Sequence, residues 1–206
     1  MTKMKDDIEK IKPKLVQNRN LPIAIINQEP ADFDFADVDG TMKKITKKLG
    51  KWNTVSISQV LDTGCFSFET EFNSPNLQYF GIGIVRDSYN IPASANAANS
   101  PNKENMAIYG VVTHEDGSIS YKGIRTEGNQ KLKSNQIIKA EYDSEKGTLI
   151  IFVNGVQQPV YVSGIKEKIR FVVYMCHSGS ICTIRSLKKL KAPTSGHVAN
   201  EQAVQW

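Results

Sequence analysis

Residues 141–161 read EYDSEKGTLIIFVNGVQQPVY, in which a charged turn leads into an apolar run, then Asn154-Gly155 and a polar return. Because side chains alternate between the two faces of a strand, the run 148–153 would place apolar groups on both faces. Asn-Gly supplies the two left-handed residues that a tight hairpin needs. The stretch predicts a central strand of a two-layer sandwich, with one face covered by an opposing sheet and the other by a loop or terminal segment.

The chain from Asn53 to Leu187 shows the same pattern of short strands and turns. Apolar or alternating runs are separated by clusters of Gly, Asn, Asp and Ser, and no clear amphipathic helix interrupts them. Strands at such short intervals are typical of an all-β antiparallel sandwich or barrel. The expected strands lie within 53–61, 64–72, 78–85, 106–112, 118–123, 136–142, 148–153, 159–162, 169–175 and 181–187.

The composition favours one globular domain with tails, since 40% of the 206 residues are hydrophobic and 23% are charged. No run reaches the roughly 20 apolar residues of a membrane-spanning helix, and nothing resembles a signal peptide. The three cysteines, Cys65, Cys176 and Cys182, lack the spacing of a disulfide framework. We therefore expect a cytoplasmic protein with no membrane span.

The net charge of +5 is unevenly distributed along the chain. Residues 1–20, 43–51 and 185–191 hold 15 of the 26 lysines and arginines, whereas 52–184 is almost neutral. A duplex-binding domain concentrates basic charge along one face to neutralise phosphates. We therefore expect solvated basic tails and no specific nucleic-acid partner.

Three segments are expected along the chain. Apolar residues at helical spacing within 8–15 are interrupted by a proline, which predicts at most a short helix. Residues 1–40 would form a helical or extended N-terminal extension that packs on or leads into the domain. The sandwich would occupy 41–191, and 192–206 would be a flexible C-terminal tail with an exposed Trp206.

Five stretches of the chain, in the same order, resemble the motifs of SPRY domains. The most specific is the Asp-x-x-x-Gly-Thr-Leu pattern followed by Asn-Gly in the fourth stretch. The five are TGCFSFETEF (63–72), YFGIGIVRDSY (79–89), IYGVVTHEDGSISYKG (108–123), SNQIIKAEYDSEKGTLIIFVNG (134–155) and IRFVVYMCHSGSICTIRSL (169–187).

The sequence also departs from the SPRY pattern. Phe68 replaces a frequent Trp, Ser134 and Asn135 replace Gly and Asp, and Val172 replaces Pro. These changes preserve bulk or turn chemistry and indicate a divergent member. The resemblance implies a bent two-sheet antiparallel β-sandwich of the concanavalin-like jelly-roll type. It also implies a non-catalytic module that recognises a protein or peptide through its loops, often within a ubiquitin ligase or other larger complex.

The first candidate site is the irregular stretch 86–105, which is longer than most loops of compact domains. Its first part carries Arg86, Asp87 and Tyr89, residue types found at interaction hot spots or as their polar partners. A tolerated insertion with no partner is the alternative. We predict that these three side chains contribute to partner binding.

The second candidate site is the turn CHSGS at 176–180, which falls at the binding face by comparison with SPRY domains. His177 stands near the position of an exposed aromatic residue in one ligase-linked subgroup, and Ser178 follows it. His114 and Arg125, from neighbouring turns, would complete the rim. Plain hairpin tips are the alternative.

The sequence gives little support to metal, cofactor or catalytic sites. Cys176, His177 and Cys182 lack the fourth ligand of a structural zinc site. Glu69 and Glu71 alternate toward solvent and have no third carboxylate at suitable spacing, which disfavours a glycosidase. We therefore predict no enzyme activity, no cofactor and no metal.

Two other functions remain open on the sequence. A carbohydrate-binding sandwich domain would need a concave face with exposed aromatic side chains, of which few are apparent. A scaffold subunit would dock into a larger assembly through its basic tails, and its association would be sensitive to salt.

Overall fold

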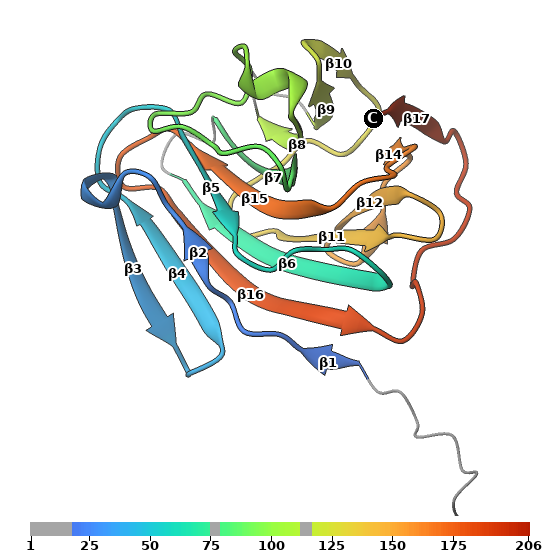
Figure 1. The fold of residues 1–206 in the computed structure, drawn as a ribbon, viewed down its shortest axis with the longest axis horizontal. Helices are drawn as coiled ribbons and strands as arrows, with labels where there is room; N and C mark the ends of the chain where they lie inside the picture. The colour runs from blue at the N-terminus through green and yellow to red at the C-terminus, as the bar shows by residue number, and fades with distance from the viewer. Residues whose placement is uncertain (1–17, 75–78, 112–116) are drawn as a thin grey trace, which may run out of the picture.

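A computed structural model describes residues 18–74, 79–111 and 117–206 as two β-sheets packed face to face (Figure 1). Two short 3-10 helices, η1 (Pro30–Asp32) and η2 (Asn102–Glu104), lie in the connections. The short helix expected within 8–15 lies outside the described residues.

The strands of the two sheets follow in spatial order. The first sheet contains β17 (Gln202–Gln205), β14 (Val160–Ser163), β12 (Thr148–Val153), β11 (Ile137–Asp143), β6 (Cys65–Asn73), β16 (Ile181–Leu190), β4 (Met42–Lys47) and β3 (Phe33–Val38), with β1 (Arg19–Asn20) also paired to β16 and β13 (Val156–Gln157) to β12. The second contains β10 (Ile124–Thr126), β9 (Ser118–Tyr121), β8 (Met106–Val111), β7 (Phe80–Arg86), β15 (Ile169–Met175), β5 (Asn53–Ile57) and β2 (Ile25–Ile26). Among the pairings described, only that of β14 with β17 is parallel.

Apolar side chains that alternate along the strands form the core between the sheets. Phe68 of the first sheet stacks on Phe171 of the second, with ring centres 5.0 Å apart. Phe72 of the first sheet meets Phe80 of the second at a tilt of 36°, with ring centres 4.9 Å apart. All four are buried, and their strand neighbours face outward. The predicted all-β antiparallel sandwich is confirmed.

Residues 148–153 form a central strand, as their apolar pattern predicted. β12 lies inside the first sheet between β11 and β14, and its Leu149 and Ile151 are buried in the core. The turn to β13 places Asn154 and Gly155 at φ of 49° and 81°, the left-handed values that a tight hairpin requires.

The outer face of β11 and β12 is covered by the segment that follows β16. Glu141, on this face of β11, is 1% exposed and accepts hydrogen bonds from the backbone of Thr194 (2.8 Å) and Ser195 (2.9 Å). Lys139 Nζ lies 3.6 Å from the centre of the Phe152 ring. A terminal segment therefore covers the second face, as the sequence pattern predicted.

The two outer segments are more integrated than the sequence suggested. β1 and β3 pair with strands of the first sheet, and β2 pairs with a strand of the second. The domain boundary expected after residue 40 therefore falls inside the first sheet, in the turn between β3 and β4. The segment 192–206 was expected to be a flexible tail but contains β17, which pairs with β14. Trp206 was expected to be exposed but is half-buried, because its ring stacks on Tyr121 with centres 4.8 Å apart.

Within the described residues, no helix has both the length and the apolar character needed to cross a bilayer.

Candidate functional site

The segment 87–105 forms a cap over the outer face of the second sheet. Its Ile91, Ala95 and Ala97 are buried against side chains of β7, β8 and β15. Thr54 Oγ1 in β5 donates a hydrogen bond to the carbonyl of Ala95 at 3.0 Å. This predicted recognition loop is therefore largely part of the packed body of the domain.

Arg86, at the end of β7, is engaged inside the molecule. Its Nη2 donates to the hydroxyl of Tyr121 at 2.9 Å, and its guanidinium forms an ion pair with Glu167. The guanidinium also lies 4.7 Å from the centre of the Trp206 ring. Arg86 thus joins β7, β9 and the segment after β16, and it lies apart from the turn that carries His177.

Asp87 and Tyr89 surround Arg170, a buried arginine on the outer face of β15. Arg170 Nη2 donates to the carbonyl of Tyr89 at 2.9 Å, and its Nε lies 3.2 Å from Asp87 Oδ1. The Tyr89 hydroxyl donates to Asn102 Oδ1 at 2.7 Å. Burial raises the pKa of Tyr89. These contacts fix the start of the cap.

The other residues predicted for the rim are in different places. Arg125 is exposed on β10, at the edge of the second sheet, beside a small hollow of about 140 Å³ that Lys103 and Tyr121 also line. His114 lies outside the described residues. The structure therefore does not bring the predicted site residues together into one surface.

His177 and Ser178 lie in the turn between β15 and β16, next to aromatic side chains from distant parts of the chain. The His177 ring is 5.4 Å from that of Tyr79, and the Tyr79 ring is 4.5 Å from that of Trp52. Trp52 also stacks on the buried Tyr174 at 5.9 Å. Trp52, Tyr79 and His177 are each half-buried, and we call them the aromatic patch.

The turn beside the aromatic patch is held by hydrogen bonds to the end of β4. Ser178 Oγ donates to the carbonyl of Lys48 at 2.6 Å, and the backbone of Gly179 donates to the carbonyl of Lys47 at 2.9 Å. His177 Nε2 is buried and makes no hydrogen bond within the described part of the chain. A buried nitrogen without a partner is costly, and a bound group could satisfy it.

A buried ion pair supports the other side of the patch, where β5 begins. Lys47 and Asp32 pair with both side chains almost fully buried, and Asn53 Nδ2 donates to Asp32 Oδ2 at 2.9 Å. Burial lowers the pKa of Lys47, and its contact with Asp32 opposes this shift. Because Asn53 follows Trp52 directly, this network fixes the backbone that presents the Trp52 ring.

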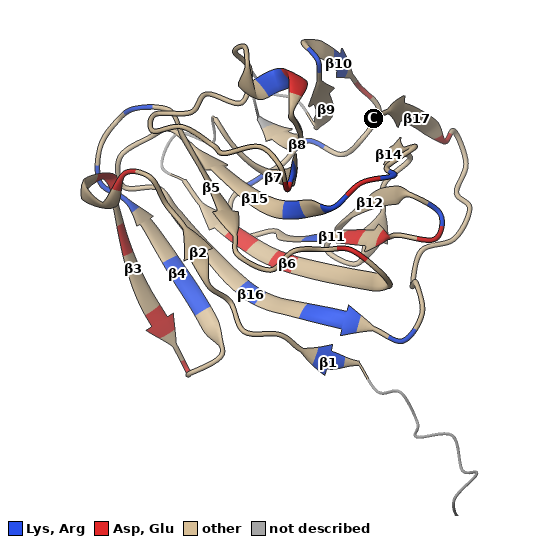
Figure 2. Cartoon of the chain, viewed as in Figure 1, with Lys and Arg blue, Asp and Glu red and all other residues tan. Residues whose placement is uncertain are grey.

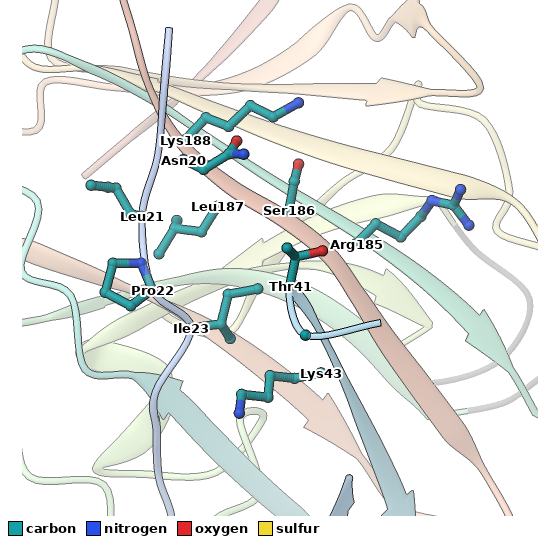
Figure 3. Close-up of a pocket in the computed structure, with 11 residues that line it drawn as sticks. Asn20, Leu21, Pro22, Ile23, Thr41, Lys43, Arg185, Ser186, Leu187 and Lys188 are labelled. Carbon is teal, nitrogen blue, oxygen red and sulfur yellow. The ribbon is translucent and has the colours of Figure 1, made fainter. Parts of the chain in front are cut away.

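A groove of about 470 Å³ lies between the segment Asn20–Ile23, β16 and the tip of the β3–β4 hairpin (Figure 3). Lys43, Arg185 and Lys188 line it. Lys43 and Arg185 pair with Asp37 and Glu71, respectively. None of the residues predicted for the site lines this groove.

Charged side chains of both signs are distributed over the first sheet (Figure 2). Lys and Arg residues lie on β1, β4 and β16, and acidic residues lie on β3 and β6. Arg185 Nη1 lies 2.7 Å from Glu71 Oε2. Glu69 accepts a hydrogen bond from Ser186 at 3.2 Å. The described residues contain no group of three or more His, Cys, Asp or Glu side chains that could hold a metal ion.

The sequence singled out His177 and Ser178 as candidates but gave no sign that Trp52 and Tyr79 lie beside them. Both rings stand where a strand of the second sheet begins, which is the one local signal that could have identified them.

No protein-family model matches this sequence, and no curated protein matches it. Several solved structures are similar to it. The TRIM65 PSpry domain has a TM-score of 0.57 at 13% identity, over 81% of this chain and 89% of that one. The SPRY domain of human HERC1 has a TM-score of 0.54 at 14% identity, over 80% and 98% of the two chains. Stonustoxin has a TM-score of 0.53 at 13% identity, over 80% of this chain and 26% of that one. The chain therefore has the fold of a SPRY domain.

Proposed function

We propose that this chain is a non-catalytic protein-interaction module that contacts a peptide or protein surface through the aromatic patch and Ser178. The observation that carries the proposal is the half-buried cluster of Trp52, Tyr79 and His177, whose histidine Nε2 lacks a partner within the described residues. Trp and Tyr are enriched among the residues that contribute most to protein interfaces.

The scaffold under the patch favours binding because it is already rigid. Ser178 and Gly179 are tied to the end of β4, and Asn53 is tied to Asp32. A surface whose side chains are held in place loses little conformational entropy when it binds. Loops positioned by a β-sandwich commonly carry recognition for this reason.

The arrangement of the rings supports a protein ligand over a carbohydrate. Trp52 stacks on Tyr174 at an interplanar angle of 7° and meets Tyr79 at 83°. The rings therefore do not form the flat platform on which a sugar could stack. Protein side chains can fill the angular surface that these rings create.

Three finer predictions, drawn from the SPRY resemblance, the charge distribution and the cysteine pattern, stay predictions. They are a role as the recognition part of a ubiquitin ligase or other larger complex, the lack of a specific nucleic-acid partner and a cytoplasmic location. Docking through the basic tails stays the alternative for a scaffold subunit. Arg125 stays a predicted contact residue.

Selection of a phage-displayed random peptide library on the purified chain tests the proposal directly. We expect peptides to be enriched, and a His177→Ala, Ser178→Arg double variant to lose them, because the arginine would cover the patch. Val156→Arg serves as the matched control, since Val156 is 62% exposed on a different hairpin.

Equal thermal stability of the three proteins is required for the comparison. Enriched peptides that bind the double variant and the wild type equally would place recognition elsewhere. A library that yields no peptide specific for the wild type would contradict the proposed function.

A further inference from the structure

The segment Gln202–Trp206 is attached to the domain in the way that a peptide ligand is attached to its receptor. It pairs as a strand with the side of β14 that faces away from β12, with Val160 opposite Gln202 and Ser163 opposite Gln205. Backbone hydrogen bonds close both ends of the ladder, from Gln202 to Pro159 (3.0 Å) and from Trp206 to Ser163 (2.9 Å). Strand addition to a sheet edge is a common mode of peptide recognition.

The side chains of the segment alternate as expected for an added strand. Val204 and Trp206 turn inward and are half-buried against the main core, whereas Ala203 and Gln205 are exposed. The recognised pattern is thus an extended backbone with two apolar side chains two residues apart, the second of them a tryptophan.

A socket of three residues receives the Trp206 ring. Tyr121 stacks on the ring at an interplanar angle of 10°, and the Arg86 guanidinium lies 4.7 Å from its centre. The indole Nε1 donates to Glu167 Oε1 at 2.8 Å. Stacking, a cation–π contact and a directed hydrogen bond together discriminate tryptophan from other side chains.

The socket residues also hold one another without the tryptophan. Arg86 donates to the Tyr121 hydroxyl and pairs with Glu167, so two contacts link β7, β9 and the loop before β15. A site formed in this way is pre-organised, so its side chains lose little conformational entropy when a ligand binds.

The link between the segment and the domain runs over the surface. Thr194 and Ser195 bind the buried Glu141, but beyond them His197 is fully exposed and bonds only locally, to Glu201. The chain up to Ala199 therefore satisfies Glu141 without help from β17.

We infer that the β14 edge and the socket of Arg86, Tyr121 and Glu167 form a peptide-binding site for an extended segment bearing tryptophan, and that residues 202–206 occupy this site as an exchangeable ligand. The site is separate from the aromatic patch and is independent of the proposed function. A tethered segment has an effective concentration of roughly millimolar, so it outcompetes a free peptide of moderate affinity.

The test uses a variant that ends at Ala199 and a fluorescein-labelled peptide of residues 201–206, EQAVQW, with fluorescence anisotropy as the readout. We expect saturable binding to the shortened chain and at least about tenfold weaker binding to the 206-residue chain, whose site is occupied. The peptide EQAVQA should bind at least about tenfold more weakly than EQAVQW. Glu167→Ala in the shortened chain should weaken binding, whereas Lys166→Ala, its exposed neighbour, should not.

A folded shortened chain that does not bind EQAVQW would overturn the inference, as would equal binding of EQAVQA. If the shortened chain does not fold, a protease site inserted after Ala199 allows the full chain to be cut after folding. Release of residues 200–206 by excess EQAVQW, seen by gel filtration, would support exchange. Retention of that fragment under the same excess would contradict it.

Discussion

At the scale of single residues, the pair of Lys47 and Asp32 links the stability of the domain to its aromatic patch. Asp32 accepts hydrogen bonds from Asn53 (2.9 Å) and from the backbone of Leu49 (3.2 Å), so its carboxylate joins three parts of the chain. Its burial follows from the register of the β3–β4 hairpin, which sets Phe33 opposite Lys47.

We predict that Asp32→Ala lowers the free energy of unfolding by about 3–5 kcal/mol, because it leaves the Lys47 charge buried without its partner. Urea unfolding at neutral pH measures the change. The matched control is Asp34→Ala, which removes an exposed ion pair with Lys48 and should change the free energy by less than about 0.5 kcal/mol. Equal changes in the free energy of unfolding for the two substitutions would contradict the burial of the Lys47–Asp32 ion pair.

Glu141 provides a second residue-scale prediction, on the dependence of stability on pH. Burial alone would raise its pKa, but hydrogen bonds from Thr194 and Ser195 and the charge of Lys139 bring it below its ordinary value of 4.5. A carboxyl group with a lowered pKa in the folded state stabilises the fold above its unfolded pKa. That contribution is lost as the pH falls through the folded pKa.

We therefore expect the melting temperature of wild type to exceed that of Glu141→Gln at pH 7, and the difference to shrink as the pH falls below about 4.5. Melting curves followed by circular dichroism between pH 3 and pH 7 measure it. Glu145→Gln, at an exposed position of the same hairpin, should follow the wild type at every pH. If wild type and Glu141→Gln differ in melting temperature by the same amount at every pH in this range, the charge of Glu141 does not stabilise the fold.

At the scale of secondary-structure elements, the close approach of β7 and β8 depends on glycine. A Cβ at Gly83 would lie 1.9 Å from the carbonyl oxygen of Ala107 on the neighbouring strand. Both strands lie inside the second sheet, so neither can move away easily.

We predict that Gly83→Ala destabilises the domain by more than about 2 kcal/mol or prevents folding, because backbone atoms of β8 would have to move. Gly50→Ala is the control, since a Cβ there meets nothing within 4 Å, and it should change stability by less than about 0.5 kcal/mol. Chemical denaturation of both variants measures the change in the free energy of unfolding. A Gly83→Ala protein as stable as wild type would contradict the close approach of β7 to β8.

The elements themselves were largely predictable from the sequence. Alternation along 64–72 identified β6, and the apolar run 148–153 identified β12, because such patterns are a local property of a strand. The strands that were not expected are β1 to β4, β10, β13 and β17. Five of them have only two to four residues, and β3 and β4 lie before residue 53, where no strand was expected. The pairing of β10 and β17 depends on the neighbouring strand presenting an open edge.

At the scale of the whole molecule, the sandwich encloses its thiols. Cys65, Cys176 and Cys182 are all reduced and buried. Burial raises the pKa of the Cys65 thiol to about 12 and that of Cys182 well above its ordinary value. A protonated, buried thiol is a poor nucleophile.

We expect these thiols to react with Ellman's reagent at pH 8 only as fast as the domain opens, and all at once in guanidinium chloride. A Ser178→Cys variant supplies an exposed thiol as the positive control, and one equivalent should react at once in the native protein. Prompt reaction of a thiol in the native wild type would contradict the burial.

The candidate binding surfaces were less predictable than the strands. Comparison with SPRY motifs indicated His177 and Ser178, but it could not show that Trp52 and Tyr79 lie beside them. Arg86 was predicted to bind a partner, and in the structure it already contacts Trp206. Each of these contacts joins residues far apart in the chain, so it depends on how the strands cross and on their register.

The sequence by itself determined that this chain is an antiparallel sandwich and located most of the strands between residues 53 and 187. These features follow from alternation and turn chemistry, which act between neighbouring residues. Only the tertiary structure decided that 87–105 is a packed cap, that Trp52, Tyr79 and His177 form one patch, and that Trp206 fills a socket. These features depend on the packing of two sheets, where residues that are distant along the chain come into contact.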